Sequence, residues 1–80
     1  MATKQIISPL PGTFYRRPAP ESPPFKAEGD RIAAGDAIGL VEVMKSFHEI
    51  KAQFAGKIIK FLIDNEEPIM AGQPIADVEE

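Results

Sequence analysis

Short apolar runs separated by turn residues dominate the chain, and no window shows helical periodicity. Eight prolines and six glycines among 80 residues interrupt every stretch in which apolar residues could recur at helical spacing. The runs are rich in Ile, Val, Phe and Tyr and are bounded by Gly, Pro or Asp, which favours strands. We predict strands over residues 5–8, 12–15, 37–42, 47–51, 56–62 and 75–78. Strands so short and so closely spaced are typical of a small barrel or sandwich.

An internal repeat relates the two halves of the chain. The pattern Ile-x-Ala-Gly-x-x-Ile begins at Ile32 and again at Ile69, and the same offset of 37 residues also matches a later Val-Glu pair. Its glycines, Gly35 and Gly72, suit a turn that needs positive φ before a strand begins. A strand unit that cannot bury its own apolar face should pack against its copy about a pseudo-twofold axis. The sequence therefore predicts a small all-β barrel built from two similar halves.

Each half should contribute apolar side chains to one shared core. Phe47 is assigned to this core, whereas His48 is interpreted as a solvated strand residue and Glu49 as surface charge. A lone histidine with no carboxylate or cysteine partners makes no metal site. The side chains predicted to point inward are Ile6, Phe14, Ile32, Ile38, Leu40, Val43, Ile50, Phe54, Ile58, Phe61, Ile69, Ile75 and Val78.

The first half also carries an insertion. Gly12 aligns with Gly56 at an offset of 44 rather than 37, so about seven extra residues lie between Tyr15 and Phe25. This segment holds four prolines in nine residues, and their fixed φ values prevent it from pairing as a central strand. We expect a stiff finger that stands off the barrel, with an ordinary surface loop as the alternative.

The stretch that joins the two halves is predicted to be a hairpin between Glu42 and Phe47, with Met44 and Lys45 at its tip. An exposed lysine is protonated at neutral pH, which argues against a general base or a Schiff-base nucleophile. Its flexible stem instead presents an amine that a modifying enzyme can deprotonate and acylate. From these residues alone, an ordinary solvated turn lysine is the competing interpretation.

Composition narrows the classes of partner and compartment. Nine basic and twelve acidic residues, mixed along the chain, give a net charge of −3, which argues against nucleic acid or an anionic membrane as the main partner. The chain has no cysteine, which excludes disulfides and thiolate metal sites and fits a reducing compartment. No apolar run approaches the roughly 18 residues of a membrane span. We therefore expect a cytoplasmic protein.

The residues around the predicted tip resemble a known attachment motif. The sequence from Glu42 to Lys45, Glu-Val-Met-Lys, is similar to the Glu, Ala or Val, Met, Lys, Met motif of biotin carboxyl carrier proteins and biotinyl domains, with Ser46 in place of the last methionine. The resemblance runs from about Ile6 to Glu79 and includes the family's Ser-Pro-x-x-Gly-Thr-Phe-Tyr opening at residues 8–15. The finger, at about residues 17–24, looks like the thumb of carriers of the multisubunit acetyl-CoA carboxylase type.

This resemblance implies an all-β flattened barrel, or barrel-sandwich hybrid, of two quasi-symmetric four-stranded halves, which form a single biotinyl domain over residues 1–80. It implies that a biotin protein ligase attaches biotin covalently to Lys45, guided by Glu42 and Met44. Arg17 stands where thumb-bearing carriers usually have Ser or Thr, and it is the candidate thumb contact for biotin.

The same resemblance implies that the domain carries a carboxyl group from a biotin carboxylase to a carboxyltransferase, without being an enzyme itself. Acetyl-CoA carboxylase and fatty acid biosynthesis are the default setting, although the acceptor could also be propionyl-CoA, urea or oxoproline. A lipoyl carrier domain and an unmodified interaction domain are the alternatives.

Overall fold

The computed structural model describes residues 2–80, and all of its regular structure is β-strand. Met1, the first residue of the predicted 1–80 domain, lies outside the described residues. Over the described range, no helix is long and apolar enough to cross a membrane, and no group of potential ligand side chains could hold a metal ion. The strands are β1 (Thr3–Ile7), β2 (Gly12–Tyr15), β3 (Arg31–Ile32), β4 (Ala37–Val43), β5 (Ser46–Lys51), β6 (Gly56–Phe61), β7 (Glu67–Ile69) and β8 (Pro74–Glu79).

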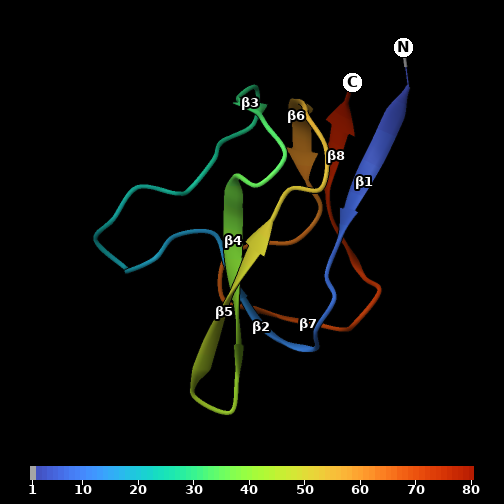
Figure 1. Ribbon diagram of the computed structural model, residues 1–80. Coiled ribbons are helices and arrows are strands. Elements are labelled where there is room, and N and C mark those ends of the chain that lie inside the picture. The colour runs from blue at the N-terminus through green and yellow to red at the C-terminus, as the bar shows by residue number, and fades with distance from the viewer. Residues whose placement is uncertain (1) are drawn as a thin grey trace.

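The strands form two four-stranded antiparallel sheets, with the orders β1-β8-β6-β3 and β5-β4-β2-β7. Each sheet takes strands from both halves of the chain, so the halves interlock. The molecule measures 38 × 27 × 20 Å along its principal axes, and Figure 1 shows the turn between β4 and β5 at the end opposite both termini. The predicted all-β flattened barrel of two quasi-symmetric halves is confirmed. Strands β3 and β7 were not predicted, because two or three residues are too short to show an alternating pattern.

The backbone hydrogen bonds reproduce the internal repeat. The Gly35 N–H donates to the carbonyl of Ala52 at 2.8 Å, and the Gly72 N–H donates to the carbonyl of Ser8 at 2.7 Å. The two donors are 37 residues apart and the two acceptors 44, the same two offsets that align the halves in the sequence. Both glycines have positive φ, 95° and 85°, a conformation that costs glycine little because it has no Cβ. The pseudo-twofold relation predicted from the sequence therefore holds in the fold.

Most of the predicted inward side chains are buried or pack against the core, but Leu40 is an error. It is only half-buried, and Val41 is fully buried in its place. The register of β4 against β5 shifts between Ala37 and Gly39, where a bulge adds one residue to the strand. One extra residue exchanges the faces of every later side chain. The buried apolar residues are Ile6, Phe14, Ile32, Ile38, Val41, Ile50, Ala52, Ile58, Ile63, Ile69, Ile75, Ala76 and Val78.

The assignment of Phe47 to the core is also wrong, because 59% of this residue is exposed. The first four residues of β5 are all exposed, and Ile50 is the first buried residue of the strand. Figure 1 shows the turn-proximal part of β4 and β5 extending beyond the remaining strands. Phe47 lies three residues before the buried Ile50, so strand alternation places it on the outer face of the sheet. His48 and Glu49 are exposed, as predicted.

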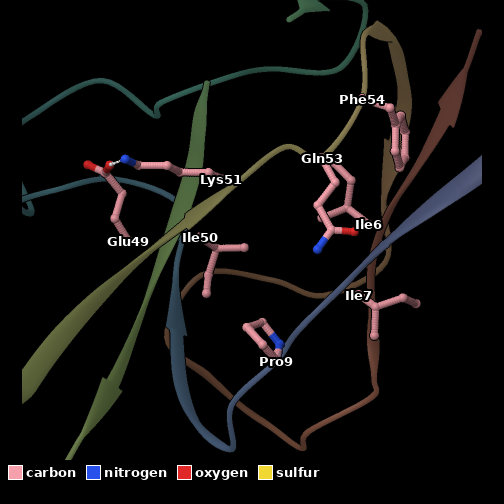
Figure 2. A pocket seen from close by; sticks show the side chains of 8 residues that line it. All are labelled: Ile6, Ile7, Pro9, Glu49, Ile50, Lys51, Gln53 and Phe54. Atoms are coloured by element: carbon pink, nitrogen blue, oxygen red, sulfur yellow. Dashed lines mark ion pairs between the residues drawn. The ribbon is translucent and has the colours of Figure 1, made fainter. Parts of the chain in front are cut away.

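The edge strands β1 and β5 belong to different sheets and flank a small cavity of about 70 Å³. Figure 2 shows Ile7 and Pro9 on one side of it and Ile50 on the other. The ion pair between Glu49 and Lys51, 3.8 Å long, lies at its rim. No strand pairing joins β1 to β5 within residues 2–80, so side chains rather than backbone hydrogen bonds line this seam, among them Lys4 of β1 at 5.3 Å from the centre of the Phe54 ring.

Candidate functional site

The tip of the β4–β5 hairpin consists of two residues in an unusual backbone conformation. Val43 pairs with Ser46, and the two residues between them, Met44 and Lys45, have φ values of 50° and 69°. Positive φ at both central residues is the signature of the type I′ turn that two-residue hairpins favour. Glycine or asparagine usually occupies such positions, because other residues lose roughly 1–2 kcal/mol in this conformation. The tip therefore holds backbone strain, a feature that is common at functional sites.

The side chains of both tip residues face solvent. Met44 is 93% exposed, and Lys45 is exposed as well. None of the ion pairs found within residues 2–80 includes Lys45, so no carboxylate restrains its amine there. An enzyme can therefore approach the Lys45 amine from solvent without displacing another part of the described chain.

Glu42, three residues before Lys45, is held by an aromatic partner. The hydroxyl of Tyr15, on β2, donates a hydrogen bond to Oε1 of Glu42 at 2.9 Å. This bond raises the pKa of Tyr15, because only the protonated phenol can donate it, and desolvation and the nearby negative charge of Glu42 add to the shift. Phe47 lies opposite Glu42 across the ladder, and its ring centroid is 5.9 Å from that of Tyr15, with the planes inclined by 54°.

The segment between β2 and β3 is tied to the barrel at its base. The Phe25 N–H donates to the carbonyl of Arg16 at 2.9 Å, which closes the segment into a loop. The Arg16 N–H donates to Oδ1 of Asn65 at 2.7 Å, and the Arg16 guanidinium lies 4.1 Å from the centre of the Phe61 ring. A cation above an aromatic face is attracted by the ring quadrupole. The two ends of the predicted finger are therefore bonded to each other, and Arg16 also anchors the finger to the second half of the chain.

A groove of about 240 Å³ lies between this segment and the outer face of the β5-β4-β2-β7 sheet. Tyr15, Leu40 and Phe47 line it from the sheet, and Arg17 lines it from the segment. The Arg17 Nε is enclosed and has no hydrogen-bond partner among residues 2–80, and the same holds for the Arg16 Nε. Aromatic walls with one cationic donor suit a small planar polar group.

The structure brings the four predicted site residues to two places rather than one. Met44 and Lys45 occupy the hairpin tip, Arg17 lines the groove, and Glu42 contacts one groove residue, Tyr15. Sequence reasoning missed Tyr15 and the exposed Phe47 as site residues. A signal for Phe47 was available, since strict alternation from a buried Ile50 puts it on the outer face.

Known proteins resemble this chain in sequence and in fold. A family model described as "Biotin-requiring enzyme" matches residues 4–78. The chain belongs to this family. The biotin carboxyl carrier protein of acetyl-CoA carboxylase from Nostoc sp. is 42% identical to it over 71 residues, which cover 89% of this chain and 39% of that protein. The protein of the same description from Chlamydia muridarum is 43% identical over 70 residues, covering 88% of this chain and 43% of its own length.

Solved structures share the fold of this biotinyl domain. The urea carboxylase of Kluyveromyces lactis superimposes with a TM-score of 0.78 at 28% sequence identity, covering 99% of this chain and 6% of that much longer one. The chain spans about two fifths of the length of the two carrier proteins that it matches. What those longer proteins do as a whole therefore reaches this chain only as a proposal.

Proposed function

We propose that this domain is a biotin carboxyl carrier, which bears biotin on Lys45 and takes a carboxyl group from a biotin carboxylase to a carboxyltransferase. Residues 1–80 then form one cytoplasmic carrier domain of a multisubunit carboxylase, with acetyl-CoA carboxylase of fatty acid biosynthesis as the default. The observation that supports it best is the exposed amine of Lys45 on a strained two-residue turn between two pseudo-symmetric halves.

The chemistry required of the chain is the acylation of one amine. The deprotonated Lys45 Nζ attacks the carbonyl carbon of biotinyl-AMP in the ligase, forms an amide and expels AMP. Loss of this cationic centre takes the formal net charge of the chain from −3 to −4. Bound biotin supplies the ureido nitrogen on which a carboxyl group travels. The domain itself makes no bonds in the later transfers, but it raises the effective concentration of that group at each partner enzyme.

Residues beside the amine set which enzymes accept the hairpin. Met44 presents an almost fully exposed apolar side chain, which would be unfavourable at a turn unless a partner covers it. Glu42 presents a carboxylate at the base of the same hairpin. We assign both residues to recognition by the biotin protein ligase.

Arg17 is the proposed contact between the thumb, about residues 17–24, and biotin. Its guanidinium offers fixed N–H donors in a groove whose other walls include Tyr15 and Phe47. A ureido ring is small, planar and polar, which matches those walls and that donor.

Mass spectrometry of the intact chain tests the carrier function. The chain is co-expressed with a biotin protein ligase and biotin, and the expected result is a mass increase of one biotinyl group together with capture on streptavidin. Lys45→Arg should abolish both, whereas Lys51→Arg, a matched change of an exposed lysine on β5, should leave both intact. An unmodified mass for the wild-type chain would overturn the proposal, and modification by a lipoate ligase instead would favour the lipoyl alternative.

A further inference from the structure

The hydrogen bond between Tyr15 and Glu42 crosses the outer face of the sheet diagonally. In the register of β2 against β4, Thr13 lies opposite Glu42 and Tyr15 lies opposite Leu40. A long aromatic side chain can reach a diagonal neighbour on the same face. The Tyr15 hydroxyl does so at 2.9 Å, in a partly buried position.

The pseudo-symmetric half of the barrel lacks this hydrogen bond. The equivalent of Glu42 is Glu79, 37 residues later. The β6 residues that correspond to Tyr15 are Ile59 by the sequence offset and Lys60 by strand pairing. In the described part of the chain, neither forms a hydrogen bond or an ion pair with Glu79. The fold thus builds the same corner without such a pair, which indicates that the barrel does not require it.

The hydrogen bond between Tyr15 and Glu42 instead restrains a side chain beside the hairpin tip. An unrestrained glutamate on a strand end samples several rotamers, and a partner that binds it must immobilise the side chain. Tyr15 removes that freedom in advance, and the ring of Phe47 packs against Tyr15 from the other side of the Glu42 strand. A carboxylate has about four acceptor positions, so one bond to Tyr15 leaves the others free for a partner's donors.

We propose that Tyr15 is a positioning residue for the modification of Lys45: its hydroxyl holds the Glu42 carboxylate in the orientation that the biotin protein ligase binds. This inference rests on the carrier function proposed above, and it assigns specificity to a residue on another strand, outside the motif around the lysine. Glu42 and Tyr15 then act as one recognition unit, with Phe47 as its support.

Ligase kinetics on the unmodified domain test this inference. Tyr15→Phe keeps the ring and its contact with Phe47 but removes the donor. Without this bond the ligase must itself immobilise the Glu42 side chain, which should raise KM for the domain about three- to tenfold. The value of kcat should stay unchanged, because the interaction is made in the ground state and the transition state alike. In a Glu42→Ala background the same change should alter KM less than twofold, because the two residues act through one bond.

A matched control and a second measurement keep the outcome interpretable. Glu79→Ala removes the equivalent carboxylate at the opposite end of the barrel and should leave ligase kinetics unchanged. Tyr15 is the only tyrosine of the chain, so its ionisation can be followed by ultraviolet absorbance without the ligase. Glu42→Ala should lower the pKa of Tyr15 toward its ordinary value, because the carboxylate that raises it is gone.

The outcomes separate this inference from the proposed function. A KM of Tyr15→Phe within twofold of wild type, or equal effects of Tyr15→Phe with and without Glu42, would overturn the positioning role while leaving the carrier function intact. Unchanged kinetics in Glu42→Ala would remove Glu42 as a ligase determinant and overturn the inference as well. A wild-type domain that the ligase leaves unmodified would refute the proposed function, and this inference with it.

Discussion

Replacing Met44 with glycine should make the domain more stable and a poorer ligase substrate. Met44 has a φ of 50°, where a residue with a Cβ loses roughly 1–2 kcal/mol relative to the right-handed region. Glycine avoids that loss. The Met44 side chain is 93% exposed, so its removal sacrifices almost no packing. On the proposed function, stability and acylation should move in opposite directions, because the change relieves backbone strain and removes the side chain assigned to ligase recognition.

The net gain follows from two opposing contributions. Glycine increases the conformational entropy of the unfolded chain, which lowers the free energy of unfolding by about 0.4–1 kcal/mol and offsets part of the relieved strain. The free energy of unfolding should therefore rise by about 0.5–1 kcal/mol. For a chain of 80 residues, this corresponds to an increase in Tm of about 2–8 °C.

Thermal unfolding followed by circular dichroism measures the shift, with Met70→Gly as the control. Met70 is 69% exposed but is not among the residues with positive φ. Met70→Gly should therefore lower the Tm of the domain, because it relieves no strain and widens the unfolded ensemble. Ligase assays on both variants should show a loss of acylation for Met44→Gly alone. A lower Tm for Met44→Gly, or equal shifts for the two variants, would refute the argument from backbone strain.

Three further changes test other parts of the domain. Deletion of residues 17–24 joins Arg16 to Phe25, which are already linked by a backbone hydrogen bond of 2.9 Å. The deletion should leave folding and biotinylation intact but slow carboxyl transfer, and loss of the folded state would show that the segment is structural. Glu66 has a φ of 66° where the equivalent residue of the first half is Gly29, so Glu66→Gly should raise the free energy of unfolding in urea by about 0.5–1 kcal/mol, and an unchanged or lower value would contradict the prediction. Because the hydrogen bond to Glu42 raises the pKa of Tyr15 in the folded state, the stabilising contribution of this bond should be complete below a pH of about 10 and lost as the pH rises above it. Tyr15→Phe should therefore lose less stability at alkaline pH than the wild type, and equal losses of stability in the variant and the wild type would argue against the bond.

Local signals in the sequence were sufficient for the longer strands and for the relation between the halves. Alternation and turn residues act over a few positions, and the repeat Ile-x-Ala-Gly records the same turn twice, at Gly35 and Gly72. The same logic failed for β3 and β7, whose two or three residues become strands only because a longer neighbour supplies their hydrogen bonds. The positions of Met44 and Lys45 followed from the repeat, since turn propensity would not have selected them.

The sequence by itself determined the duplicated β architecture, the joining hairpin and the motif around Lys45, because each depends on residue types at set spacings. Only the tertiary structure decided which face each side chain occupies. A single bulge in β4 placed Val41 in the core and Leu40 in the groove. This outcome depends on one residue of register between paired strands, which side-chain alternation along a single strand does not record.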